Sequence, residues 1–89
     1  MSEIFDVLEK SQSIEILVAL QDKDRLFLSE LLEILDTKDT NTVSKRIKIL
    51  RETSLIKEEG EEKVSGRRYI WLTTKGKKIA ALLAEIGKI

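Results

Sequence analysis

Apolar residues near the start of the chain recur at the spacing of helical turns. They form two groups that would each lie on one helical face: Ile4, Phe5 and Leu8, then Ile14, Leu17, Val18 and Leu20. Ser11 lies between the groups, where its hydroxyl can cap the second helix. The pattern therefore predicts two helices, or one continuous helix, before the charged turn at residues 22–25.

A short strand and a short helix are expected after that turn. The apolar run at residues 26–28 fits a brief strand, and Ser29 is placed as the N-cap of a helix. Glu30 is favourable at the positive end of that helix. The expected apolar positions of the helix are Leu31, Leu32 and Leu35. The helix should end before residues 36–39, which have the composition of a turn.

Asp39 predicts the start of a third helix, because its carboxylate can accept a backbone N–H from about Thr42. The helix is expected to run to about residue 53, with an inward stripe formed by Val43, Ile47 and Leu50. Its opposite side and flanks carry small polar and basic residues: Thr40, Asn41, Thr42, Ser44, Lys45, Arg46, Lys48 and Arg51. This polar side is a candidate binding surface.

Two extended segments and a final helix complete the pattern. Residues 55–59 and 68–73 have strand character and are joined by a polar loop bounded by glycines, which predicts a β-hairpin. Thr73 or Thr74 then opens a helix that ends near Gly87. The predicted apolar face of this helix consists of Ile79, Leu82, Leu83 and Ile86.

These elements predict a mostly helical α+β fold. In their order they form a winged helix-turn-helix, with a three-helix core, a β-hairpin wing and flanking N- and C-terminal helices. Eighty-nine residues suffice for one hydrophobic core and not for two, so residues 1–89 are expected to be a single domain. We expect its core over about residues 11–75 and its C-terminal helix over about residues 74–87.

The charges cancel over the whole chain, with 16 basic and 16 acidic side chains, but they are segregated along it. Residues 1–37 carry a net charge of minus six, and residues 52–62 carry minus four. The intervening residues 38–51 carry plus four, and residues 63–78 carry plus six. Two basic stretches separated by an acidic one can fold onto one face, where they would provide a positive surface for phosphates.

Several classes of function are excluded by what the chain lacks. It has no cysteine and no histidine, which removes disulfides, thiolate or imidazole metal sites and a base that titrates near neutrality. With neither a nucleophile paired with a base nor a glycine-rich phosphate loop, no enzyme activity, cofactor or metal is expected. Residues 1–10 lack the features of a secretory signal and no apolar run could span a bilayer, so we expect a cytoplasmic protein without membrane contact.

The predicted helix-turn-helix and hairpin fit the grooves of double-stranded DNA. The helix that follows Asp39 can enter the major groove, where the amide of Asn41 can pair in two ways with adenine. Lys45 and Lys48 would reach guanine edges or phosphates. The other expected DNA contacts are hydroxyls and cations at phosphates or in the neighbouring minor groove: Thr40, Thr42, Ser44, Arg46, Lys63, Arg67 and Arg68.

The chain resembles the winged-helix transcriptional regulators of bacteria and archaea, in the broad group that includes the MarR and ArsR types. The resemblance covers about residues 11–86 and rests on the order and spacing of its motifs. They are Leu28-Ser29-Glu30-Leu31-Leu32, Thr42-Val43-Ser44-Lys45-Arg46-Ile47-Lys48-Ile49-Leu50, Leu55-Ile56, Gly66-Arg67-Arg68-Tyr69 and Leu72-Thr73-Thr74-Lys75-Gly76. The resemblance implies sequence-specific binding of double-stranded DNA for the control of transcription.

It also implies a homodimer, with the two-fold interface formed by helices outside the motif. Apolar residues at both ends of the chain can supply that interface: Ile4, Phe5, Leu8, Leu82, Leu83 and Ile86, together with Ile89. The alternative is that these residues pack on one another as core.

A second interpretation of the whole chain is a winged helix used for protein contact or architecture without sequence-specific DNA binding, since fold does not determine function.

The start of the last helix carries three lysines, Lys75, Lys77 and Lys78, where the helix end is already positive. Either a phosphate or the glutamates of the hairpin can balance this positive charge. Tyr69 and Trp71 are more typical of sheet packing than of base stacking.

Overall fold

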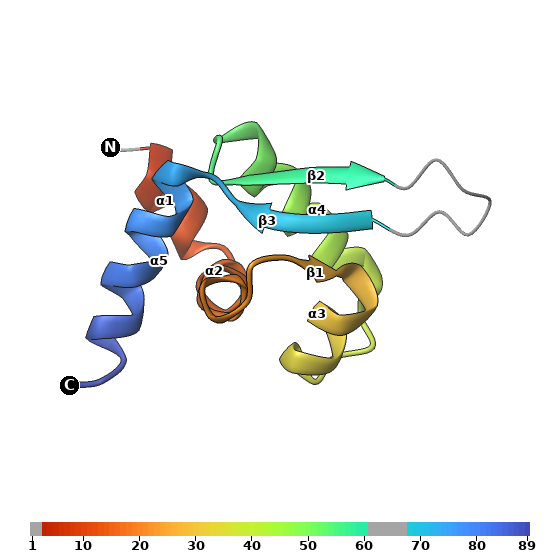
Figure 1. Cartoon of the computed structure of the whole chain (residues 1–89), viewed down its shortest axis with the longest axis horizontal. Coiled ribbons are helices and arrows are strands. Elements are labelled where there is room, and N and C mark those ends of the chain that lie inside the picture. The colour runs from red at the N-terminus through yellow and green to blue at the C-terminus, as the bar shows by residue number, and fades with distance from the viewer. Residues whose placement is uncertain (1–2, 61–67) are drawn as a thin grey trace.

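The computed structural model describes residues 3–60 and 68–89, and within these ranges the chain forms five helices and three strands (Figure 1). In chain order they are α1 Glu3–Glu9, α2 Ser13–Asp22, β1 Leu26–Phe27, α3 Leu28–Leu35, α4 Thr40–Glu52, β2 Ile56–Gly60, β3 Arg68–Leu72 and α5 Thr74–Ile86. This architecture confirms the predicted mostly helical α+β fold, a winged helix-turn-helix with flanking helices. The tip of the predicted wing, with Lys63 and Arg67, lies outside the described residues.

The N-terminal segment is two helices and not one. Gln12 has a φ of 69° and a left-handed conformation, which breaks the helical path between α1 and α2. Gln12 is also the N-cap of α2, and its side chain makes no capping hydrogen bond. The prediction that Ser11 caps this helix is therefore wrong. The Ser11 carbonyl and hydroxyl oxygens instead accept hydrogen bonds from Arg46, which lies 35 residues further along the chain.

Helix α3 begins earlier than predicted. Its N-cap is Phe27, and the Glu30 carboxylate accepts a hydrogen bond of 3.0 Å from the Phe27 backbone N–H. Leu28, expected to end the strand, is thus the first helical residue, and the placement of Ser29 as the N-cap is wrong. Strand pairing explains the shift, because Phe27 is held opposite Tyr69 and the helix can start directly after it.

The three strands form an antiparallel sheet in the order β1-β3-β2. Ile70 pairs with Leu26 on one side, and Leu72 pairs with Ile56 on the other, and all four residues are buried. Tyr69 lies on the alternate face of β3, where its ring packs on Phe27 with the centroids 4.4 Å apart. One face of the sheet therefore lies in the core, because successive side chains of a strand point to opposite faces.

Every element contributes to a single hydrophobic core. Helix α2 supplies three of its most buried side chains and packs against α1, α3, α5 and β3. The predicted inward stripe of α4 is confirmed, because Val43, Ile47 and Leu50 are all buried. The other buried apolar side chains are Val7, Ile16, Leu17, Leu20, Leu26, Leu31, Leu55, Ile56, Ile70, Leu72 and Ala80.

The first turn of helix α5 and its N-cap contact the segment that directly precedes β2. Thr73 is its N-cap: the side-chain oxygen accepts a hydrogen bond of 3.0 Å from the Gly76 N–H, and the hydroxyl donates to the Ser54 carbonyl at 2.7 Å. The Thr73 N–H also donates to the Leu55 carbonyl at 3.1 Å. A Cβ on Gly76 would lie 1.9 Å from that carbonyl oxygen. Only glycine therefore allows α5 to approach the chain so closely.

The inward side of α5 differs from the predicted one. Gly76 and Ala80 are its buried residues, and Ile79 and Leu83 pack only partly against the core. The small residues let the helix backbone come close, so the packing stripe is rotated away from the larger apolar side chains. Leu82 and Ile86, predicted for the same apolar face, are 55% and 64% exposed.

Candidate nucleic-acid interface

The turn between α3 and α4 orients the helix-turn-helix. Asp36 ends α3 in the left-handed conformation, with φ 53° and ψ 49°, and donates its backbone N–H to the Glu33 carbonyl at 3.1 Å. The Thr37 N–H donates to the Leu32 carbonyl at 3.2 Å. Aspartate tolerates the left-handed conformation better than most residues do. The tight turn is therefore made without a glycine.

Asp39 caps α4 as predicted. One carboxylate oxygen accepts the Thr42 N–H at 3.1 Å, and the other accepts the Thr42 hydroxyl at 2.6 Å. These bonds, first the hydroxyl and then the backbone one, together with the nearby positive charge of Lys45, lower the pKa of Asp39 below its ordinary value. The Thr42 hydroxyl has a single hydrogen, which it gives to Asp39, so in this structure it has none to donate to a phosphate.

The cap makes folding sensitive to acid. Because the pKa of Asp39 is lower in the folded state, its stabilising contribution is present above the ordinary value of 3.8 and is lost as pH falls through the folded pKa. We expect thermal unfolding of Asp39→Asn, followed from about pH 6 to about pH 2, to approach that of the unmodified protein at the acidic end. A difference in unfolding temperature that stays constant over this range would contradict the assignment.

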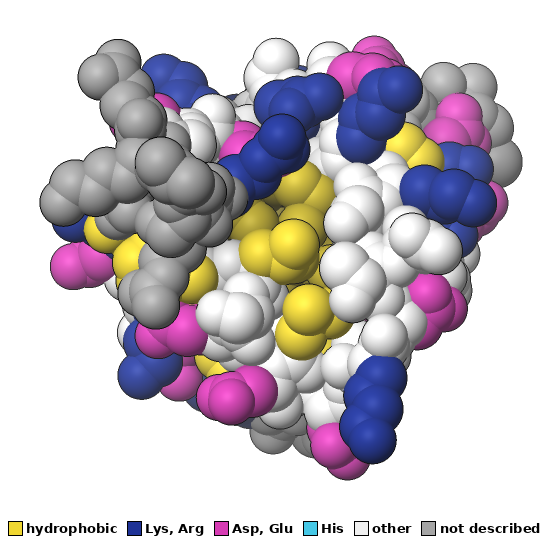
Figure 2. Space-filling view, turned by 90° about the vertical axis from the view of Figure 1, so that its right-hand side faces the viewer, with side chains coloured by type: hydrophobic (Ala, Val, Ile, Leu, Met, Phe, Trp, Pro, Cys, Tyr) yellow, Lys and Arg dark blue, Asp and Glu magenta, His cyan; other side chains and the backbone are white. Residues whose placement is uncertain are grey.

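Most of the predicted contact residues of α4 share its solvent-facing side. Thr40, Asn41, Ser44, Lys45 and Lys48 are all exposed, opposite the buried stripe. Figure 2 shows the right-hand side of Figure 1, where hydrophobic groups are visible in a hollow and several Lys and Arg side chains stand at its upper edge. The structure thus offers a polar and cationic surface next to the sheet.

Arg46 is placed differently from the other basic residues of α4. It is half-buried, and its guanidinium donates to the Ser11 carbonyl at 2.9 Å and to the Ser11 hydroxyl oxygen at 3.3 Å. It therefore ties α4 to the turn between α1 and α2. This placement favours a structural role over the predicted DNA contact.

One arginine of α4 and one arginine of β3 meet at a glutamate of β2 on this side. The Glu58 side chain on β2 is only 8% exposed, and its carboxylate pairs with Arg51 of α4 at 3.3 Å and with Arg68 of β3. The two arginine side chains remain 46% and 62% exposed. Arg68 is one of the DNA contacts predicted from the sequence, whereas Arg51 is predicted only as a basic residue at the flank of α4. Nothing local in the sequence indicates that Glu58 joins the two, because the bridge depends on how α4 packs against β2.

The residues proposed for dimerisation divide into two groups. Leu8 and Leu83 pack against the core, which fits their alternative role as core residues, and Ile4 is half-buried. Phe5, Leu82 and Ile86 are 59%, 55% and 64% exposed. Helices α1 and α5 lie at the end of the molecule opposite the tips of β2 and β3 (Figure 1). An apolar surface there would leave the helix-turn-helix and the hairpin uncovered.

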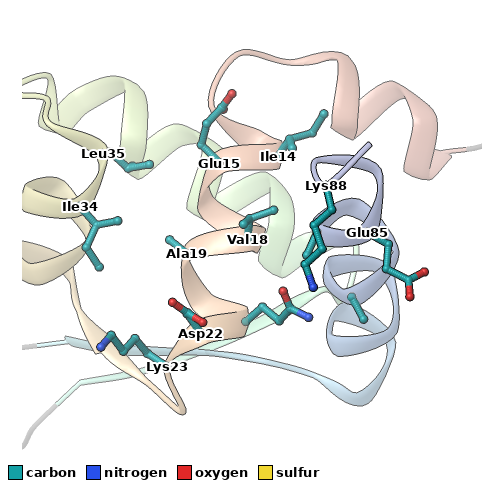
Figure 3. A pocket seen from close by; sticks show the side chains of 13 residues that line it. Ile14, Glu15, Val18, Ala19, Asp22, Lys23, Ile34, Leu35, Glu85 and Lys88 are labelled. Carbon is teal, nitrogen blue, oxygen red and sulfur yellow. The ribbon is translucent and has the colours of Figure 1, made fainter.

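A separate hollow of about 1060 Å³ lies over α2 between α3 and α5 (Figure 3). Ile34 and Leu35 of α3 line one side, and Ile14 and Val18 of α2 lie across from them. Its charged side chains have both signs: Glu15, Asp22, Lys23, Glu85 and Lys88. Because acidic groups outnumber basic ones there, this hollow does not favour phosphate, and the α4 surface is the better nucleic-acid candidate.

Within residues 3–60 and 68–89, no three Asp or Glu side chains gather closely enough to hold a metal ion. In the same part of the chain, no helix combines the length and the apolar character needed to cross a membrane.

The sequence matches no protein-family model and no curated protein, but solved structures resemble the fold closely. A candidate MarR-family transcriptional regulator from Porphyromonas gingivalis aligns at a TM-score of 0.86 with 20% identity, over 94% of this chain and 81% of the other. The reduced form of the transcriptional regulator YodB from B. subtilis aligns at 0.80 with 20% identity, over 96% and 82%. A transcriptional regulator homologue from Pyrococcus horikoshii aligns at 0.72 with 19% identity, over 99% and 92%. At these identities the likeness is one of fold, and this chain has the winged helix-turn-helix fold that these proteins share.

Proposed function

We propose that this protein is a sequence-specific transcriptional regulator that binds double-stranded DNA as a homodimer, with α4 in the major groove and the wing on the backbone or in the minor groove. The observation that carries the proposal is the exposed side of α4, where Asn41, Ser44, Lys45 and Lys48 face solvent together. Amide, hydroxyl and ammonium groups suit base edges and phosphates, whereas a protein-binding surface would more often expose large apolar groups.

Two further observations support the proposal. The solved structures of the same fold include proteins described as transcriptional regulators. Exposed apolar side chains on α1 and α5 could join two copies, so that two α4 helices would reach successive major grooves.

The proposal is tested by selecting bound sequences from a duplex DNA library at about 50 mM and about 200 mM salt. We expect enrichment of a palindromic site with half-sites about one helical turn apart. The Lys45→Ala, Lys48→Ala variant should bind that site about 10- to 100-fold more weakly, because it loses contacts to phosphates or guanine.

The matched control is Lys23→Ala, Lys88→Ala, which removes the same charge from exposed residues beside the hollow over α2. This variant should bind almost as tightly as the unmodified protein, because its lysines lie away from the α4 surface. If no sequence is enriched and binding stays weak at low salt, the regulator proposal fails. The α4 surface would then be the place to look for a protein partner.

A further inference from the structure

A cleft of about 310 Å³ lies where α4 meets the sheet, beside the surface assigned above to the major groove. Its apolar lining comes from Leu28, Ile47 and Ile70. Its polar lining includes Lys48, the two arginines paired with Glu58, and the hydroxyl of Ser44. The cleft thus combines hydrocarbon with one hydroxyl, three cations and the carboxylate of Glu58.

We propose that this cleft holds one backbone phosphate of duplex DNA with its deoxyribose, and that Glu58 is a positioning residue that sets Arg51 and Arg68 for that phosphate. The inference rests on the proposed function, because it names further contacts of the same DNA-binding face. It adds Arg51 to the binding residues and assigns a role to an acidic group on an otherwise cationic surface.

The charges around the cleft favour a phosphate. Lys48, Arg51 and Arg68 contribute three positive charges against the one negative charge of Glu58, so the lining is cationic. Each bond to Glu58 uses a single nitrogen, Nη1, of a guanidinium that carries five N–H groups. Both arginines can therefore bind Glu58 and still offer donors to a phosphate oxygen. Leu28, the half-buried apolar residue of the lining, can contact the carbon atoms of the adjoining sugar.

The burial of Glu58 argues that it orders the arginines and does not compete with them. Its side chain is 8% exposed, so the carboxylate faces the two guanidiniums and not the solvent. Arginine side chains have many rotamers, and a group that holds them in place before binding reduces the entropy lost on binding. Glu58 also spans two elements, since Arg51 is on α4 and Arg68 begins β3. It therefore sets the distance between the major-groove helix and the base of the wing.

The test uses the sign of the effect of Glu58→Gln on affinity for the selected DNA site. If Glu58 only places a negative charge near DNA, removing that charge should strengthen binding. If it positions the arginines, binding should weaken, and we expect a loss of about tenfold together with a shallower salt dependence. Glu59→Gln is the matched control, because Glu59 is the next residue of β2 and is exposed. It should bind as tightly as the unmodified protein or slightly more tightly.

Further variants separate positioning from folding. Arg51→Ala should lower the magnitude of the salt slope by about one, and Glu58→Gln should have a smaller effect in the Arg51→Ala background than alone. If Glu58→Gln unfolds at a much lower temperature than the unmodified protein, the double variant Arg51→Lys, Arg68→Lys tests instead whether the orientation of the two guanidiniums matters. It keeps both positive charges but loses the guanidinium fork. That variant should also bind about tenfold more weakly.

The outcomes distinguish this inference from the proposed function. If the unmodified protein and Glu59→Gln bind the site while Glu58→Gln binds equally or more tightly, the positioning role is overturned and the regulator proposal stands. Full affinity of Arg51→Lys with Arg68→Lys would overturn it in the same way. If the unmodified protein binds no duplex even at low salt, both proposals fail together.

Discussion

The Leu82→Glu, Ile86→Glu variant is expected to be a folded monomer that binds a two-half-site DNA at least about 100-fold more weakly than the unmodified protein. Leu82 and Ile86 are more than half exposed on α5, so charges at these positions can be solvated without disturbing the core. In a dimer they would be buried, and four carboxylates would enter an apolar interface without partners. The expected loss of affinity follows because each half-site would then bind independently.

The monomer is detected by sedimentation velocity or by light scattering after gel filtration, and affinity by titration of full-site and half-site duplexes. Binding to a half-site should change little, since α4 is untouched. Ile34→Glu is the control, because Ile34 is a similarly exposed apolar residue on α3 and should leave the dimer intact. A dimer that survives the double change on α5 would place the interface elsewhere. An unmodified protein that is already monomeric at the concentrations that bind DNA would refute the homodimer.

Gly76→Ala is expected to destabilise the protein by about 2 to 4 kcal/mol, because overpacking against a rigid group usually costs more than alanine gains in a helix. The new Cβ would lie 1.9 Å from the Leu55 carbonyl oxygen, which is backbone and cannot rotate away. Helix α5 would have to move, and its movement would weaken the hydrogen bonds that link Thr73 to Ser54 and Leu55. The midpoint of thermal unfolding should fall by about 10 to 20 °C, as expected for a domain of this size.

Gly87→Ala provides the matched comparison on the same helix. Gly87 has a φ of −64°, and a Cβ there would meet its nearest atom, the Ala84 carbonyl oxygen, at 3.5 Å, an ordinary contact. We expect this variant to be neutral or stabilised by up to about 1 kcal/mol. Equal stability of the two alanine variants in urea and thermal unfolding would show that the close approach at Gly76 does not determine the packing of α5.

Local sequence signals predicted most of the elements, since their physical causes act over a few residues. Asp39 and Thr73 cap α4 and α5 by accepting N–H groups three residues ahead; Asp39 was the expected cap of α4, and Thr73 was one of two expected starts of α5. The inward stripe of α4 was also found from its spacing alone. The placement of Ser29 failed for a definite reason: Ser29 satisfies the local rule for an N-cap, whereas Phe27 has no side-chain acceptor and only donates its backbone N–H to Glu30. Only the pairing of Phe27 with Tyr69 across the sheet decides between them.

The candidate site was predicted in part. The sequence indicated that Asn41, Lys45 and Lys48 share a polar helical side, because that follows from 3.6 residues per turn. It could not show that the Thr42 hydroxyl is bound by Asp39 or that Arg46 is bound by Ser11. The type of a residue shows which hydrogen bonds its side chain can make, but not which partner it meets in the folded chain.

By itself, then, the sequence determined the order of helices and strands, the cap of α4 and the segregation of charge along the chain. Tertiary structure alone decided the Glu58 bridge between Arg51 and Arg68, the close approach of Gly76 to Leu55, and the exposure of Leu82 and Ile86. The physical reason is the distance along the chain over which each interaction acts. Periodicity and capping act within one or two helical turns. Ion pairs and close packing between elements depend instead on distances that exist only after the whole core has formed.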